Sequence, residues 1–371
     1  DDNRAAETAI QEKINIECMA NNINTQVKSA TKWSAITEIA AKLITPITSI
    51  ILARLLAPEA FGIVATLTMV ISFAEIFTDA GFQKYLIQHE FEDAEDREQS
   101  TTVAFWSNLV MSLLLWALIA VFAAPLATLV GNPGMGNVLI IACVSIPLAA
   151  FSSIQMALYK RDFDFKTLFK VRMVGILVPL IVTVPLAFWM RSFWALVIGT
   201  IAVNVCNAVL LTIYSSWKPR LFYSWNKLKE MLSFSCWSMF EQISIWLTGY
   251  IDVFAIGVFL NQYYLGLYKN SISLVGQITG IITAATTPVL FAALSRLQDS
   301  REDFLNLFFR FQKLVGILVI PLGVGIFCYS DLITDLLLGS QWSEAAPFIG
   351  LWGLTSAVTI VLAHYCSEVY R

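Results

Sequence analysis

The stretch that decides the fold runs from Arg54 to Gln88 and reads RLLAPEAFGIVATLTMVISFAEIFTDAGFQKYLIQ. A turn signal at Ala57–Gly62 precedes an apolar run long enough to cross a bilayer, and a second turn follows at Asp79–Gly81. The same plan returns later in the chain, where Asn261–Leu267 takes the place of Ala57–Ile63. A hydrophobic chain that repeats itself at half length is typical of a transporter whose two lobes enclose a path near the membrane midplane.

The composition places the chain in a membrane. Its 371 residues are 57% hydrophobic and only 14% charged, with a mean hydropathy of +0.69. The net charge is −3 and the basic residues lie in separate loops, so no nucleic-acid partner is expected. Six scattered cysteines and two histidines predict no disulfide framework, no metal site and no bound cofactor.

Windows of about 20 apolar residues predict roughly ten membrane-spanning helices. The sequence therefore predicts an all-α polytopic membrane protein with two pseudo-repeated helical lobes around a central cavity. The expected spans are 33–56, 61–82, 102–129, 137–159, 168–190, 193–217, 231–259, 266–294, 308–338 and 345–369.

These spans divide the chain into two unequal parts. We predict a first lobe of six helices at 31–217, a basic cytoplasmic linker at 218–230, and a second lobe of four helices at 231–371. The second lobe is expected to be incomplete, with at least two further helices missing after it. Residues 1–30 are polar and lack the apolar core of a signal peptide. Met19 is a candidate native start, which would make 1–18 non-native.

The positive charges predict the orientation of the helices. Lys and Arg concentrate in the even-numbered loops, which places the amino terminus in the cytoplasm and leaves only short external loops. A membrane enzyme needs a sizeable external segment to hold its catalytic groups, so we expect a protein that is not an enzyme. The residues in the even-numbered loops are Lys84, Arg97, Lys160, Arg161, Lys166, Lys170, Lys218, Arg220, Lys227, Lys229, Arg296 and Arg301.

Four strings in this order resemble the Wzx-type polysaccharide flippases of the multidrug/oligosaccharidyl-lipid/polysaccharide exporter superfamily. They are Ala53–Gly62 (ARLLAPEAFG), Asp79–Phe82 (DAGF), Tyr159–Phe165 (YKRDFDF) and the half-repeat Ile251–Gln298. The resemblance covers the chain from about Trp33 to its end. Family members usually have twelve or fourteen helices in two six-helix lobes, so the missing carboxyl end is a departure.

The resemblance implies a function in O-antigen or lipopolysaccharide synthesis. The chain is expected to export an undecaprenyl-pyrophosphate-linked oligosaccharide across the bacterial inner membrane by alternating access, driven by a proton or sodium gradient. Membrane lipids, the polysaccharide polymerase and the chain-length machinery are the partners that it implies.

Ionisable residues inside the first two spans are candidates for function, because each costs at least about 2.5 kcal/mol to insert. Glu38 and Lys42 are spaced i, i+4, which fits either a self-satisfied ion pair or a cavity-lining pair in which Lys42 attracts an anionic substrate. Glu75 and Asp79 are two like charges on one helix face, which suits a proton or cation site. Asp79 also fits a solvated helix cap, so Glu75 is the stronger candidate.

The seventh and eighth spans carry further candidates. Ser238, Glu241, Thr248 and Asp252 form one stripe, and Lys269, Ser273, Gln277 and Gly280 form another. Lys269 either snorkels to the outer interface or faces the cavity, where it would hold a pyrophosphate together with Lys42. We thus predict substrate binding by Lys42, Lys269 and Gln277, and cation coupling by Glu38, Glu75, Glu241 and Asp252.

Other polar and aromatic residues have simpler interpretations. Arg172 fits an anchor at the cytoplasmic interface, and an interfacial belt accounts for most Trp and Tyr residues near helix ends, including Tyr250. No sugar-stacking role is assigned to them.

Three alternative functions remain open at this point. A drug or small-molecule exporter of the same fold would prefer a cavity dominated by Glu and Asp. A membrane glycan polymerase or acyltransferase is disfavoured by the short external loops, and a non-transporting remnant is conceivable because the second lobe is short.

Overall fold

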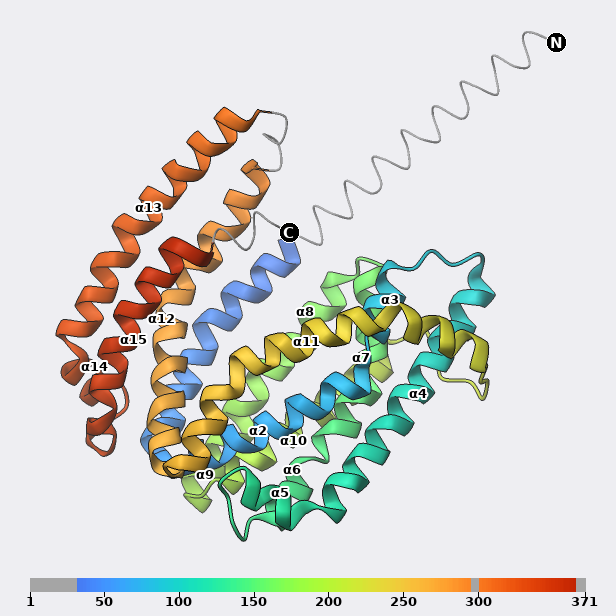
Figure 1. Cartoon of the computed structure of the whole chain (residues 1–371), viewed down its shortest axis with the longest axis horizontal. Helices are drawn as coiled ribbons and strands as arrows, with labels where there is room; N and C mark the ends of the chain where they lie inside the picture. Colours follow the sequence, from blue (N-terminus) through green and yellow to red (C-terminus); the bar gives the residue numbers. More distant parts are fainter. Residues whose placement is uncertain (1–31, 295–299, 365–371) are drawn as a thin grey trace.

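The computed structural model describes residues 32–294 and 300–364, which are helical with short connections and contain no strand (Figure 1). This confirms the predicted all-α fold. In chain order the helices are the first helix (Lys32–Leu55), α2 (Pro58–Asp79), α3 (Phe82–Gln88), α4 (Ala94–Val121), α5 (Ala123–Leu129), α6 (Gly136–Ala142), α7 (Ser145–Arg161), α8 (Phe165–Val178), α9 (Val184–Met190), α10 (Trp194–Tyr214), α11 (Trp225–Phe259), α12 (Gln262–Leu294), α13 (Arg301–Cys328), α14 (Ser330–Leu337) and α15 (Ala346–Thr359).

Nine helices of the described chain are long and apolar enough to cross a membrane. In two of them a pair of adjacent helices makes one span, α6 with α7 and α8 with α9. A π-helical turn at Pro179–Thr183 joins α8 to α9, since Pro179 and Pro185 interrupt regular α-helical bonding there. Helix α12 is a further long helix of 33 residues. The nine spans and α12 together match the ten predicted.

Helices α4 and α11 are two of the helices that begin earlier than hydrophobicity predicts. Helix α4 starts at Ala94 because the Asp93 carboxylate accepts a 2.6 Å hydrogen bond from the Asp96 backbone N–H and caps the helix. Helix α11 starts at Trp225, inside the predicted linker, and its first turns bury Leu228 and Met231 in a cluster with residues of α3 and α4. Capping and tertiary burial therefore extend both helices beyond their apolar segments.

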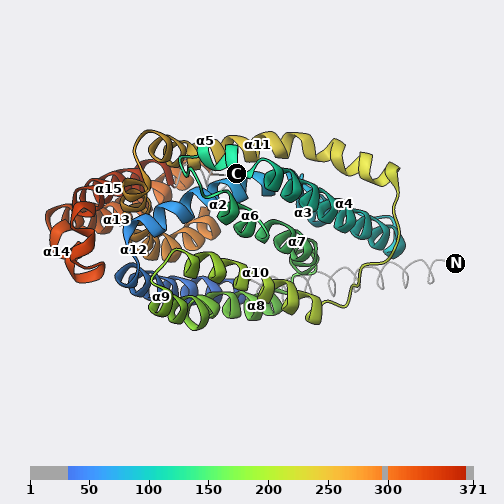
Figure 2. The same ribbon diagram turned by 90° about the horizontal axis from the view of Figure 1, so that it is seen from below.

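The helices fall into two groups in both views (Figures 1 and 2). Helices α12 to α15 gather at one side of the molecule, whereas α3, α4 and α7 lie at the other. Helix α11 packs along α2, α3 and α4 as well as against α12. The seventh long helix thus joins the two groups, although the sequence assigns it to the second lobe.

The two groups meet where α2 crosses α12, at the two turns of the sequence repeat. A Cβ atom on Gly62 would collide with the backbone carbonyl of Gln262, and a Cβ atom on Gly266 would collide with the backbone carbonyl of Pro58. Pro58 and Gln262 are equivalent in the repeat, as are the two glycines. The contact is therefore reciprocal, as expected at a pseudo-two-fold axis.

Replacing Gly266 with Ala tests this crossing. The added methyl group has no space against the Pro58 carbonyl, so we expect Gly266→Ala to lower the free energy of unfolding by about 3 kcal/mol. The matched control is Gly276→Ala on the same helix, where a Cβ would meet nothing within 4 Å and helix propensity favours Ala. Thermal unfolding of the two purified variants provides the comparison, and equal melting temperatures would contradict the close approach.

Candidate functional site

The interlobe seam, defined as the contact of α12 and the α14–α15 connection with the first helix and α2, holds the predicted substrate-binding residues Lys42 and Gln277, and Lys269 lies on α12 beside it. At the end that contains the repeat turns, called the turn end below, the seam is closed by hydrogen bonds to backbone carbonyls. Gln341 Nε2 and Trp342 Nε1 each donate a 2.7 Å bond to the Ala53 carbonyl. Arg54 donates to the last carbonyls of α14, at Leu336 and at Leu337, where its charge also complements the helix dipole.

The turn end is also joined by side chains next to the glycine crossing. Thr66 Oγ1 of α2 donates to Gln262 Oε1 of α12 at 3.2 Å, and Gln262 Nε2 donates to the Gly131 carbonyl at 2.8 Å. Gly131 itself abuts the backbone of Gly257 in α11. Backbone contacts and amide hydrogen bonds thus close this end. None of the contacts just described is an ion pair between two side chains.

One face of α12 lines the seam and carries a strip of polar residues. We call this the α12 strip, and its members share one helical face. They are Lys269, Asn270, Ser273, Gln277 and Gly280. Gln277 Nε2 donates to Ser273 Oγ at 3.0 Å and lies 3.5 Å from Ser49 Oγ of the first helix. The predicted face of the eighth span therefore does lie against the first lobe.

The two predicted lysines lie at opposite ends of the strip. The Lys42 side chain rests against Gly280, so close that a Cβ there would be 2.8 Å from its Nζ. Lys269 Nζ lies over the ring of Tyr250, 5.2 Å from its centroid. Positions 269 and 280 are 280 − 269 = 11 residues apart, which is about 16 Å along a helix. The structure does not bring the two ammonium groups to a common point.

Three of the predicted carboxylates have partners on other helices. Glu38 pairs with Arg172 of α8 at 3.8 Å rather than with Lys42, and Glu241 pairs with Lys84 of α3 at 3.7 Å. Both carboxylate side chains are more than half exposed, at 52% and 54%. Asp252 Oδ2 accepts a 2.8 Å hydrogen bond from the Tyr268 hydroxyl. These groups lie at separate places and form no single cluster.

The two acidic residues of α2, Glu75 and Asp79, have different surroundings. Asp79 Oδ1 accepts a 3.4 Å hydrogen bond from the Gln83 backbone N–H beyond the helix end, as a cap would, but Asp79 is partly buried and not the solvated residue that the sequence suggests. Glu75 is partly buried. Its backbone carbonyl accepts a hydrogen bond from Thr78, but within residues 32–294 and 300–364 its carboxylate makes neither an ion pair nor a hydrogen bond.

Aromatic contacts that sequence reasoning missed link α2, α11 and α12. Trp246 Nε1 donates to Ser72 Oγ at 3.0 Å, and its ring contacts Phe73 on one helix and Tyr250 on its own. The Lys269 ammonium lies over the ring of Tyr250. Tyr250 thus packs where α11 meets α2 and α12, a set of contacts that the interpretation as part of an interfacial belt does not include. The i, i+4 spacing of Trp246 and Tyr250 was the available signal.

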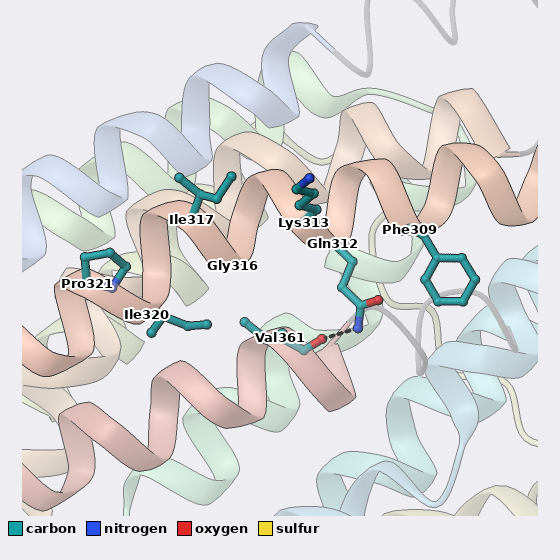
Figure 3. A pocket seen from close by; sticks show the side chains of 8 residues that line it. All are labelled: Phe309, Gln312, Lys313, Gly316, Ile317, Ile320, Pro321 and Val361. Atoms are coloured by element: carbon teal, nitrogen blue, oxygen red, sulfur yellow. Dashed lines mark hydrogen bonds between the residues drawn. The ribbon is translucent and has the colours of Figure 1, made fainter.

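A hollow of about 620 Å³ lies between α13 and the segment after α15 (Figure 3). Its lining is mostly apolar, and Gln312 crosses it to donate a 2.8 Å hydrogen bond to the Val361 carbonyl. None of the predicted site residues lines this hollow. The lining residues are Phe309, Gln312, Lys313, Gly316, Ile317, Ile320, Pro321 and Val361.

Comparison with known proteins gives consistent matches. Residues 51–347 match the family described as polysaccharide biosynthesis protein. The succinoglycan biosynthesis transport protein ExoT of Rhizobium meliloti is 26% identical over 326 residues, which are 88% of this chain and 65% of that protein. The chain thus spans just under two thirds of the length of this relative.

Two solved structures share the fold. The lipid II flippase MurJ in an inward closed conformation superimposes with a TM-score of 0.65 and 13% identity, over 89% of this chain and 75% of MurJ. An inward-facing MATE transporter of the MOP superfamily gives a TM-score of 0.56 and 14% identity, over 91% of this chain and 86% of the transporter. At such identities the likeness concerns the fold alone.

Thiol labelling tests whether the α12 strip faces water. Ser273 is exposed, whereas Ser271 on the same helix is only 1% exposed. With the native cysteines replaced, we expect Ser273→Cys to react with a charged, water-soluble thiol reagent and Ser271→Cys to resist it, because the reactive thiolate forms in water. Mass spectrometry of the labelled chains measures both. Resistance of Ser273→Cys in the membrane would show that this face is closed to water.

Proposed function

Because the chain belongs to the polysaccharide biosynthesis protein family, we propose that it is a flippase for an oligosaccharide linked to undecaprenyl pyrophosphate. It moves this lipid across the bacterial cytoplasmic membrane by cation-coupled alternating access. The fold shared with a lipid II flippase supports this function, as does the match to a transport protein. The polymerase and chain-length machinery would then receive the product on the outer side.

The closure of the seam at one end is the observation that carries the proposal. Alternating access requires a state in which one end of the path is sealed while polar groups remain reachable from the other. The turn end is sealed by the glycine crossing and by the bonds to the Ala53 carbonyl, and Ser273 further along α12 is exposed. With the cytoplasmic amino terminus that the basic loops predict, this is the inward-facing state.

Lys42 and Lys269 bind the anionic groups of the substrate in this proposal. Lysine attracts a phosphate as a point charge, and one lysine comes from each lobe. Since they lie about 16 Å apart along α12, they act at separate points in this state. The lobes must move relative to each other before both can hold one pyrophosphate.

Replacing the two lysines tests anion binding. We expect Lys42→Ala and Lys269→Ala each to reduce surface polysaccharide about tenfold, because each loses roughly 1.4 kcal/mol of charge-assisted binding. Lys313→Ala is the matched control, since Lys313 is an exposed lysine in a spanning helix that lines the hollow instead of the seam. Polysaccharide at the surface of cells that carry only the variant gives the readout. Normal surface polysaccharide in the double variant would remove the electrostatic mechanism, and dye efflux by the same chain would favour a drug exporter.

Glu75 is the carboxylate that we assign to cation coupling. Glu38 and Glu241 already have basic partners and Asp252 holds a tyrosine hydroxyl, whereas Glu75 lies partly buried in a spanning helix. A carboxylate in that position can exchange a proton or sodium ion as the helix changes its surroundings.

Neutralising Glu75 separates coupling from binding. We expect Glu75→Gln to abolish the dependence of lipid translocation on an imposed proton or sodium gradient and to leave lipid binding unchanged. Glu241→Gln, which removes a half-exposed carboxylate, is expected to keep most of the gradient dependence. Translocation into proteoliposomes with and without each gradient measures this. Persistence of gradient-driven transport in Glu75→Gln would assign coupling to another residue.

A further inference from the structure

The α12 strip contains hydrogen-bonding groups that the protein leaves unused. Asn270 is only 8% exposed, and its Nδ2 is buried without a hydrogen-bond partner. The Oε1 of Gln277 is buried and without a partner as well. Buried polar groups without partners cost free energy and are uncommon in native proteins, so two of them on one helix face need an explanation.

The spacing of these groups defines a linear site. Asn270 and Gln277 are seven residues apart, which is two helical turns and about 10 Å along one face. Ser273 lies between them and is exposed, so a ligand can reach the strip at its middle. Lys269 and the Lys42 ammonium lie at the two ends. The strip is therefore an uncharged polar segment with a cation at each end.

The chemistry of the strip indicates which ligand it takes. An amide N–H donates and an amide oxygen accepts, and a hydroxyl group can satisfy both. The strip has no carboxylate, and the positive charge of a lysine at each end disfavours a metal cation there. We propose that Asn270 and Gln277 bind hydroxyl groups in the uncharged part of the saccharide, between the two lysines. This inference rests on the proposed function and identifies the part of the substrate that α12 recognises.

The position of Asn270 links this binding to the movement of the lobes. Asn270 lies one turn beyond Gly266, where α12 crosses α2. In the closed seam its Nδ2 is buried without a partner, and we expect a separation of α2 from α12 to expose it. The unsatisfied amide therefore destabilises the empty closed seam, and a saccharide hydroxyl that binds it favours the opened one.

Two probes that differ only in their sugar test the proposal. The complete chain in lipid nanodiscs is titrated with an undecaprenyl pyrophosphate and with the same lipid carrying an uncharged tetrasaccharide. We expect Asn270→Ala and Gln277→Ala each to weaken binding of the glycosylated lipid about threefold to tenfold, and to leave binding of the bare lipid unchanged. Thermal unfolding of Asn270→Ala is expected at the same or a higher temperature, because the variant loses an unpartnered donor.

A control variant and the results that would contradict the proposal complete this experiment. Asn108→Ala removes a buried amide that also has an unpartnered oxygen but lies on α4 in the first lobe, so it is expected to change neither affinity. An equal loss for both probes in the α12 variants, or no loss for either, would overturn the hydroxyl-binding role and leave the proposed flippase intact. If the unsubstituted chain bound neither probe, the proposed function itself would fail, and this inference with it.

Discussion

The reciprocal contact between Gly62 and Gly266 sets the geometry on which the rest of the molecule depends. At this point α2 and α12 approach until backbone meets backbone, which only glycine allows. The distance between the lobes is therefore fixed by main-chain atoms and does not depend on side-chain rotamers. Because Gln262 and Pro58 occupy equivalent places in the repeat, each lobe contributes one half of the same interaction.

The crossing decides which residues of α12 face the first lobe. It places the polar face of α12 against the first helix, so that Gln277 lies near Ser49 and the Lys42 side chain packs against Gly280. The same geometry keeps the charges apart, since Lys269 remains on the ring of Tyr250 near the turn end. The two positive charges, Lys42 and Lys269, therefore lie at separate points along the polar face of α12. An extended ligand with several polar groups suits it better than a compact ion.

Local sequence patterns predicted the helices, the repeat and the polar face of α12, because apolar length and helical spacing are local properties. The partners of the charges were not predictable in this way. Glu38 was expected either to pair with Lys42 or to line a cavity beside it, yet it pairs with Arg172, because a residue on another helix lies closer in space than one a turn away. The path of α11 along α2, α3 and α4 was missed for the same reason, since burial of Leu228 and Met231 depends on tertiary contacts.

In this chain, the presence or absence of hydrogen-bond partners distinguishes polar groups that hold the structure together from groups that are candidates for binding. In the string at 159–165, Arg161 donates 2.7 Å bonds to the carbonyls of Leu86 and His89, and Asp164 caps α8 through the Thr167 backbone N–H. That string is recognisable in the sequence because it holds a turn together, and the charged groups of Arg161, Asp162 and Asp164 all have partners. Asn270 and Gln277 lie in the half-repeat on the α12 strip, and each has a buried atom with no partner. A ligand gains most from groups whose bonds are still unmade, so we propose the contact to the saccharide at the seam rather than at the turns that make the family recognisable.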